Sequence, residues 1–489
     1  MDENSTFAIV DLETTAPFKE GGHIIQIGIS FVKNWKIINN FQTMVNPGVK
    51  IPEQIVDLTG IKNKDVENAP YFEDLAQMIH DQLSGTVFVA HNVRYDFPYL
   101  NGEFARIKMR RLRLEYVDTV QLAQIVFPTM NSYKLDELVQ KLGINLPRHH
   151  RADQDASATA QLFLKIHERL QEFPQNTLNN LIHNSKSLLG NTEAIFHLSK
   201  GKKTFAGDRY GPFDVARLSV IENGQLAEWI EEKKQSSISK TIPATILRPR
   251  QESFANVFQS KIHNKNNKIF SVFSRPRFGK TNAYLDLAVK MATKEYKILI
   301  VEENYLRRRS AFQKSQSLFP ENRALFQIPI TRKDFISLDK LVSVLSSEDN
   351  PSRQLAKLRV ISWLLETKTG SLNEFVNGFP EPLFNFFSDQ KSPNKFDYFQ
   401  RSIDNYVFPS IGITDLDSFL RTRNEFSQAY DLFIFDVDKE ISNLTDTLSL
   451  FPKKVILFTQ AQSYIKNWYS IRDFSDMNSV ILSLDSELK

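Results

Sequence analysis

The first third of the chain carries short apolar runs separated by polar stretches, a pattern that predicts strands alternating with helices. An apolar run over 7–10 predicts a buried strand. Two β-rich stretches, 24–32 and 35–45, flank a Lys33-Asn34 pair, which favours a hairpin turn. Antiparallel strands followed by alternating helices and strands predict a mixed sheet covered by helices. The further elements that we expect are a strand over 86–90 and helices over 92–106, 136–142 and 155–170.

The second half of the chain has a different pattern, with fully apolar strands separated by helical stretches. Such strands are typical of a parallel sheet that is buried on both faces. Gly279-Lys280-Thr281 follows the first of these strands and precedes a helix over 282–293. The second half is therefore predicted to be an α/β domain of the P-loop kind. Its strands are expected over 268–273, 297–301, 432–435 and 455–458.

The composition changes this picture little. With 489 residues, of which 41% are hydrophobic and 24% charged, the chain is long enough for two or three globular domains. Its net charge of +4 permits a nucleic-acid partner without requiring one. Because the chain has no cysteine, disulfides, thiolate metal sites and cysteine nucleophiles are excluded. That absence fits a cytoplasmic protein, and no apolar run approaches the ~20 residues of a membrane span, so we expect no membrane partner.

Four carboxylates and a histidine stand at the ends of predicted elements. Asp11 and Glu13 come at the end of the first strand, and their i, i+2 spacing places both on one face. Asp96 begins the helix that follows the strand over 86–90. Asp155 lies in the first turn of another helix, where the helix dipole favours a carboxylate, and His150 comes shortly before it.

This set of side chains fits one kind of chemistry. Phosphodiester hydrolysis by two Mg²⁺ or Mn²⁺ ions needs several carboxylates, because one ion activates the attacking water and the other stabilises the leaving oxygen. A neutral histidine nearby takes the proton of the water. We therefore assign metal binding to Asp11, Glu13, Asp96 and Asp155, and the role of general base to His150. The alternative is a fold relic without activity, since each of these motifs, taken alone, is common on protein surfaces.

The order of these motifs resembles that of the DnaQ-like exonucleases of the DEDDh group, the family of proofreading epsilon subunits. The resemblance implies an RNase H-like fold over the first ~175 residues. It also implies that Thr14, Thr15 and Asn92 lie near the terminal nucleotide. Ala16 departs from the family, which often has glycine there. The segments that carry the resemblance are Asp11–Thr15, Asp57–Ile61, His91–Asp96 and His150-x-Ala152-x-x-Asp155.

The second half resembles the first motor domain of DinG-type helicases, which are related to the XPD group and in several cases carry an epsilon-like exonuclease at the N-terminus. Gly279-Lys280-Thr281 matches the end of a Walker A loop, and Asp436 stands at the place of a Walker B box. Two further segments resemble the stretch before the Walker A loop and the third motor motif, at 247–251 and 455–463.

Several departures from this second family predict a damaged nucleotide site. A P-loop wraps phosphates with backbone N–H groups, whereas residues 275–278 are bulky and Pro276 has no N–H. Val437 takes the place of the glutamate that would activate water. The chain also ends ~25 residues after the third motor motif, which leaves no room here for a second motor lobe. We expect a degenerate site at Gly279, Lys280, Thr281 and Asp436 that leaves ATP binding open and does not hydrolyse ATP.

These observations predict an exonuclease domain over 1–175, a connecting region over 176–240 and a degenerate helicase-like domain over 241–489. The expected activity is 3′→5′ removal of nucleoside monophosphates from single-stranded or frayed DNA ends. A basic stretch over 106–113 would steer the strand. The alternatives are an RNA-trimming exonuclease, a nucleic-acid-binding protein without activity, and an ATP-binding DinG-type helicase or nuclease in DNA repair.

Overall fold

The protein is described by a computed structural model in which the chain forms two compact units. One unit contains Met1–Val220 and Ser337–Phe396, and the other contains Ile221–Ile336 and Asp397–Lys489. The segment Ser337–Phe396, which the sequence assigns to the helicase-like half, thus belongs to the first unit, and the predicted domain boundaries stay a prediction. The structure describes residues 1–144, 151–217, 269–273, 279–345, 347, 350–375, 386–388, 396–403, 406–437, 454–459 and 479–483.

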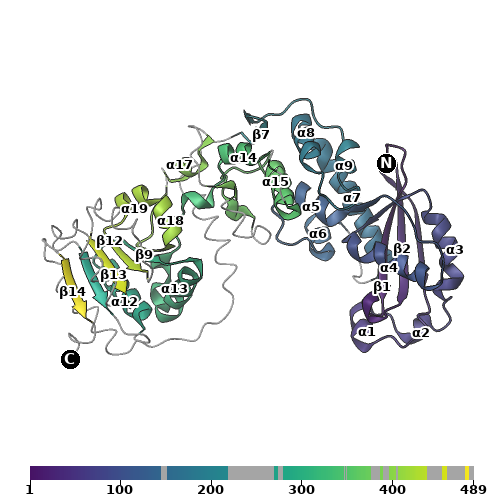
Figure 1. Ribbon diagram of the computed structural model, residues 1–489, viewed down its shortest axis with the longest axis horizontal. Helices are drawn as coiled ribbons and strands as arrows, with labels where there is room; N and C mark the ends of the chain where they lie inside the picture. Colours follow the sequence, from purple (N-terminus) through teal and green to yellow (C-terminus); the bar gives the residue numbers. More distant parts are fainter. Residues whose placement is uncertain are drawn as a thin grey trace. The chain divides into compact units, whose positions relative to one another are not determined.

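The first unit contains a five-stranded sheet in the order β3-β2-β1-β4-β5. Figure 1 labels two of its strands, β1 and β2. Strands β1, β2 and β3 are antiparallel neighbours, whereas β4 and β5 run parallel to β1. This is the predicted mixed sheet. The strands are β1 (Phe7–Thr14), β2 (Ile24–Lys33), β3 (Lys36–Met44), β4 (Val87–Ala90) and β5 (Tyr116–Asp118).

Two details of this sheet differ from the prediction. The hairpin turn is formed by Asn34 and Trp35, with φ of 50° and 57°, one residue later than expected. Positive φ at both positions is what a two-residue turn between twisted strands requires. Strand β1 does not end at Asp11, because its pairing with β2 continues through Glu13 to Thr14, with a register shift between those two residues. Asp11 and Glu13 therefore lie within a strand.

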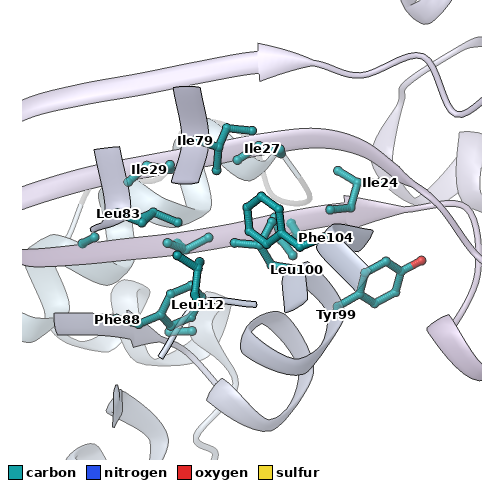
Figure 2. Packing of buried hydrophobic residues seen from close by; sticks show 14 of the residues in the cluster. Ile24, Ile27, Ile29, Ile79, Leu83, Phe88, Tyr99, Leu100, Phe104 and Leu112 are labelled. Carbon is teal, nitrogen blue, oxygen red and sulfur yellow. The ribbon is translucent and has the colours of Figure 1, made fainter. Parts of the chain in front are cut away.

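Both faces of the sheet are covered by helices. On one face, isoleucines of β2 pack against side chains of α3 (Phe72–Leu83) and α4 (Val93–Arg106), as Figure 2 shows. On the other face, α7 (Ala152–Glu172) crosses β1 and β2, and its Phe163 ring lies 5.1 Å from that of Phe7. Residues of the first face labelled in Figure 2 are Ile24, Ile27, Ile29, Ile79, Leu83, Phe88, Tyr99, Leu100, Phe104 and Leu112.

The segment Ser337–Phe396 adds helices to the first unit. Its helix α15 (Pro351–Trp363) packs against α5 (Thr119–Val126) and α8 (Gln175–Asn184), and Figure 1 shows α15 beside α5. The remaining elements of this unit are α1 (Glu53–Thr59), α2 (Asn63–Val66), α6 (Leu135–Lys141), α9 (Ala194–His197), α14 (Leu338–Leu345), β6 (Asp208–Tyr210), β7 (Phe213–Val215), and the 3₁₀ turns Phe18–Glu20 and Leu372–Glu374.

The second unit contains a seven-stranded parallel sheet in the order β10-β11-β9-β12-β13-β8-β14. The predicted α/β class is therefore confirmed for this unit as well. Its strands are β8 (Ile269–Phe273), β9 (Ile298–Glu302), β10 (Phe326–Gln327), β11 (Ile411–Asp415), β12 (Leu432–Asp436), β13 (Lys454–Thr459) and β14 (Ser479–Ser483). Its helices are α12 (Lys280–Ala292), α13 (Tyr305–Leu318), α17 (Tyr398–Ile403), α18 (Leu416–Arg421), α19 (Arg423–Ala429) and the 3₁₀ turns Pro320–Leu325 and Arg332–Asp334.

In the described parts of the chain, no helix combines the length and the apolar character that a membrane crossing requires.

Candidate active site

Three of the predicted metal ligands converge on one face of the first sheet. Carboxylate oxygens of Asp11, Glu13 and Asp155 all lie within 4.8 Å of one another. Asp11 and Glu13 come from β1, whereas Asp155 comes from the start of α7, more than 140 positions later in the chain. Three carboxylates so close together form a donor set of oxygens alone, which suits hard divalent cations such as Mg²⁺ and Mn²⁺.

The fourth predicted ligand, Asp96, lies beside this group. It is in the first turn of α4 and only 5% exposed. Its Oδ1 accepts a hydrogen bond of 3.2 Å from the backbone N–H of Leu12, which lies between Asp11 and Glu13. The charge of Asp96 also raises the pKa of Asp11, so the two carboxylates are electrostatic neighbours. The three close oxygens and Asp96 thus make up the predicted acidic site.

A close contact between β2 and the start of α7 places Asp155. Gly28 and Gln26 lie opposite Asp11 and Glu13 in the strand pair, and directly opposite residues project to the same face. A Cβ added to Gly28 would lie 2.0 Å from the carbonyl oxygen of Ala152, so the helix start rests on the glycine backbone. Gln26 then binds the helix start twice: its Oε1 accepts from Ala152 N–H at 3.1 Å, and its Nε2 donates to Asp153 at 3.0 Å.

A second set of hydrogen bonds places α4 and hence Asp96. The Asp118 carboxylate accepts from the backbone N–H of Val93 at 2.8 Å and from that of Gln121 at 2.8 Å, so it joins the starts of α4 and α5. His91, which directly follows β4, donates from Nε2 to the carbonyl oxygen of Tyr133 at 2.9 Å. These contacts fix the turn between β4 and α4, because both ends of the turn are bound to neighbouring segments.

Burial and mutual repulsion disfavour the ionised form of the carboxylates in this site. Burial, with the charges of Asp96, Asp155 and Glu13, raises the pKa of Asp11 well above its ordinary value. Burial and the charge of Asp155 raise the pKa of Glu13 to about 7. Burial raises the pKa of Asp96 to about 8, although backbone N–H donors work against the shift. A divalent cation would relieve this repulsion, because it favours the ionised form of every carboxylate around it.

The residues predicted to contact a terminal nucleotide take different positions. Thr14 is buried, and its hydroxyl shares a 2.7 Å hydrogen bond with that of Tyr95, which is 39% exposed. Thr15 accepts from the backbone N–H of His23 at 2.9 Å. Asn92 is exposed and left-handed, with φ of 76°, at the N-terminus of α4. His150 lies outside the described residues, so its role as base stays a prediction.

Sequence reasoning missed several residues that build the site. Gln26 and Gly28 lie in an apolar strand, and nothing in the sequence links them to a helix that begins more than 120 positions later. Their polar and glycine character, at alternate positions opposite Asp11 and Glu13, is the signal that could have found them. Asp118 offers a clearer signal, since an aspartate between a strand and a helix is a typical N-cap.

The predicted nucleotide site of the second unit is arranged differently. Gly279 is the left-handed N-cap of α12, with φ of 84°, as a tight loop before a helix requires. Lys280, the first residue of the helix, forms an ion pair with Asp436 at the end of β12. Both side chains are nearly buried, with exposures of 12% and 3%. Thr281 contacts the Tyr284 hydroxyl through a side-chain hydrogen bond that opposes the rise of the Tyr284 pKa caused by burial.

A second buried pair lies beside the first. Tyr284 on α12 donates a hydrogen bond to Glu302 at the end of β9. Glu302 is opposite Asp436 in the parallel sheet, and burial together with the charge of Asp436 raises its pKa to about 7. Val437, at the predicted place of a catalytic glutamate, packs against the core. The bulky residues at 275–278 and the segments 247–251 and 460–463 lie outside the described residues.

The part of the chain that contains the acidic site is similar to a known protein family. Residues 8–163 match the family model RNase_T, which is described as exonuclease. This part of the chain is thus similar to exonucleases. All four predicted carboxylates lie within the matched residues. The exonuclease kinship and the RNase H-like fold that the motifs predicted are thereby confirmed.

The similarity to known proteins extends beyond the exonuclease domain. A protein named 3′-5′ exonuclease DinG from Staphylococcus haemolyticus (strain JCSC1435) is 30% identical over 424 residues, which are 83% of this chain and 44% of that protein. Its counterpart from Staphylococcus aureus (strain USA300) is 30% identical over 427 residues, with 82% and 44% covered. The chain thus spans less than half the length of these relatives. Kinship with DinG-type proteins is confirmed, whereas the loss of motor function stays a prediction.

A solved structure of Exonuclease X in complex with 5′ overhanging duplex DNA is 26% identical to the aligned part of this chain. The alignment covers 33% of this chain and 91% of that one, with a TM-score of 0.28.

Proposed function

We propose that the chain is a metal-dependent 3′→5′ exonuclease that releases nucleoside monophosphates from DNA ends. The observation that carries the proposal is the meeting of Asp11, Glu13 and Asp155 within 4.8 Å inside an exonuclease-family domain. The 3′→5′ direction follows the name of the DinG relatives.

The carboxylates would hold two divalent ions, Mg²⁺ or Mn²⁺. Asp11, Glu13 and Asp155 are the direct ligands, and Asp96 completes the set from the first turn of α4. When bound, such ions supply an activated water and stabilise charge on the leaving oxygen. The chain itself supplies a rigid frame, because Gln26 and Gly28 fix α7, and Asp118 fixes α4. His150 would take the proton of the attacking water, and a His150→Gln variant is expected to lose about 10²- to 10⁴-fold in kcat.

A cluster of exposed cations near the end of α4 supports a nucleic-acid substrate. Lys108, Arg110, Arg111 and Arg113 follow this helix and are all exposed. Within the described part of the chain, none of these four forms an ion pair with a carboxylate, so their charges are available for phosphates. We expect an Arg110→Ala/Arg111→Ala variant to bind DNA more weakly. The slope of log affinity against log salt concentration should fall by about one for each phosphate that the variant no longer neutralises.

A digestion assay tests the proposal directly. Single-stranded DNA labelled at the 5′ end should be shortened stepwise with Mg²⁺ or Mn²⁺, and EDTA should stop the reaction. Asp11→Asn should remove the activity, whereas Asp81→Asn, at an exposed helical acid, should not. RNA of the same sequence, digested in parallel, decides between DNA and RNA trimming. Full activity in Asp11→Asn would refute the assignment.

For the second unit we propose a helicase-like module without motor function. The Lys280–Asp436 ion pair supports this, because each group already neutralises the charge that a nucleotide with its metal would meet. We expect ATP to leave the nuclease rate unchanged, and we expect no release of phosphate from ATP when DNA is present. Release of phosphate that disappears in Lys280→Ala would instead favour the ATP-dependent DinG-type alternative.

A further inference from the structure

We propose that Arg359, on helix α15, is a positioning residue of the exonuclease site that acts through Tyr133 and His91 on the metal ligand Asp96. The expected effect of Arg359 on the nuclease rate rests on the proposed function. Its expected effect on metal affinity can be measured separately. Arg359 comes from the segment Ser337–Phe396, which the sequence places in the helicase-like half and the structure places in the first unit.

The first link joins α15 to the loop before α6. Arg359 is 5% exposed, and its Nη2 donates to the carbonyl oxygen of Pro128 at 2.8 Å and to the Tyr133 hydroxyl at 3.4 Å. Its guanidinium group also lies over the Tyr133 ring, 5.5 Å from the centroid. The Tyr133 hydroxyl in turn lies 2.9 Å from the carbonyl oxygens of both Phe127 and Pro128. A buried arginine held in this way fixes the loop, because moving the loop would take these two oxygen acceptors away from a buried charge.

The second link joins this loop to the start of α4, the helix that carries Asp96. The carbonyl oxygen of Tyr133 accepts from His91 Nε2 at 2.9 Å, so this nitrogen carries the proton. The other ring nitrogen, Nδ1, lies 3.0 Å from the Thr119 hydroxyl and acts as the acceptor in the neutral ring. His91 is the residue directly between β4 and the left-handed Asn92 that begins α4. Displacement of Tyr133 would therefore release one end of the turn that places Asp96.

The expected consequence is a change in metal affinity. Outer residues that orient metal ligands typically change metal affinity or activity by 10- to 100-fold when they are removed. Arg359 is separated from Asp96 by Tyr133, His91 and the turn, so we expect the lower end of that range. Substrate contacts would be unaffected, because the loop Pro128–Tyr133 is not among the proposed DNA-binding residues.

Helix α15 offers a matched control. Lys357 is a buried cation two residues away, with 1% exposure, and its Nζ donates to Ser347 and Leu345. These hydrogen bonds stay within the segment Ser337–Phe396 and do not reach the loop Pro128–Tyr133. Lys357→Ala therefore reports the cost of removing a buried cation from α15, whereas Arg359→Ala removes the same kind of group together with the link to the site.

The experiment compares the full-length wild type with Arg359→Ala, Arg359→Lys and Lys357→Ala. Calorimetric titration with Mn²⁺ should give about tenfold weaker binding for Arg359→Ala and wild-type affinity for Lys357→Ala. The Mg²⁺ concentration for half-maximal nuclease rate should rise by about the same factor, while KM for DNA stays within about twofold. Arg359→Lys keeps the charge and a donor, and should recover part of the affinity.

Wild-type Mn²⁺ affinity in a folded Arg359→Ala variant would overturn the inference, as would an equal loss in Lys357→Ala. If Arg359→Ala does not fold, Arg359→Lys is the deciding variant, and a Mn²⁺ affinity unchanged from wild type in that variant counts against the proposal.

Different results would contradict the proposed function and the inference about Arg359. A wild type that binds Mn²⁺ through Asp11 but cleaves no nucleic acid contradicts the proposed function alone. An active wild type whose metal affinity is indifferent to Arg359 contradicts this inference alone.

Discussion

Both units place acidic side chains at the carboxyl ends of strands, but the two sets are satisfied in opposite ways. In the first unit, Asp11 and Glu13 of β1 face Asp155, and burial together with the charge of Asp155 raises the pKa of both. In the second unit, β11, β9 and β12 end at the same level with Asp415, Glu302 and Asp436. There the acids have partners from the protein itself: Arg308 for Asp415 at 2.7 Å, Tyr284 for Glu302 and Lys280 for Asp436.

This difference separates a site that needs an external cation from one that supplies its own. Buried carboxylates that repel one another cost folding free energy unless a cation binds them. Buried ion pairs are costly to break but need no ligand. The first arrangement is typical of a functional site and the second of a scaffold, even though both lie at the strand ends where α/β proteins commonly bind ligands.

The sharpest way to break the comparison is to neutralise one acid of the first set. Asp11→Asn should lower the nuclease rate by about 10³- to 10⁴-fold, because it removes a ligand of ions that contribute several kcal/mol of transition-state stabilisation. In EDTA, the same variant should unfold at a higher temperature than the wild type, because the substitution removes a buried charge. Rates come from the digestion assay and stability from thermal melting. A variant that loses activity and also loses stability would indicate damage to the fold.

In the second unit the equivalent change should act on stability instead. Lys280→Ala leaves Asp436 buried without this ion pair, so we expect the second unit to lose about 3 kcal/mol in free energy of unfolding. The nuclease rate should not change. Arg421→Ala, which removes an ion pair with the exposed Asp417 of the same unit, is the control and should cost less than about 1 kcal/mol. Urea denaturation measures both, and equal losses would contradict the distinction between the two pairs.

The position of α7 can be tested without changing any charge. Gly28→Ala places a methyl group where the carbonyl oxygen of Ala152 lies, so the helix start and Asp155 must shift. Since a misplacement of about 1 Å can cost 10²-fold in rate, we expect a loss of that order. Gly85→Ala is a useful reference for stability, because a Cβ there meets no atom within 4 Å although its φ of 75° is unfavourable. Activity of Gly28→Ala close to that of the wild type would show that α7 does not depend on this contact.

The smallest expected effect is a pH dependence of stability in the absence of metal. The pKa of Glu13 is raised to about 7 and that of Asp96 to about 8, above the values of about 4 in an unfolded chain. The folded state therefore binds more protons, and the stability that these groups contribute at low pH is lost as the pH rises through 7–8. In EDTA, the melting temperature of Asp11→Asn/Glu13→Gln should exceed that of the wild type by a margin that grows from pH 5 to pH 8. A margin independent of pH would show that these carboxylates do not titrate as the site geometry implies.

Much of the site could be predicted from the sequence, because each predicted metal ligand belongs to a short motif that is recognisable on its own. Asp11 and Glu13 lie in the latter half of a strand, and Asp96 and Asp155 lie in the first turns of helices. Those element types were predicted correctly. Which residues support them could not be read, because support depends on contacts between distant segments. Gly28 is informative only once α7 is known to cross β2.

The placement of Ser337–Phe396 was likewise beyond sequence reasoning. Residues 356–363 of helix α15 are all buried, so the helix has no single apolar face, and its sequence does not say which neighbours cover it. Arg359 has the sequence context of a surface residue, yet it is buried against the loop Pro128–Tyr133. The extent of β1 was missed for a simpler reason, since polar residues after an apolar run usually end a strand, whereas here pairing with β2 carries it on to Thr14.

The interrupted path of the chain through the first unit has a consequence for its biogenesis. The unit takes its last helices from Ser337–Phe396, so the polypeptide must be synthesised past residue 396 before the unit can close. A ribosome that adds about 5–20 residues per second needs on the order of ten seconds to cover the stretch between Val220 and Ser337. During that interval the nascent exonuclease lacks the partners of α5 and α8. The nuclease should therefore mature late in translation, after much of the second unit has left the ribosome.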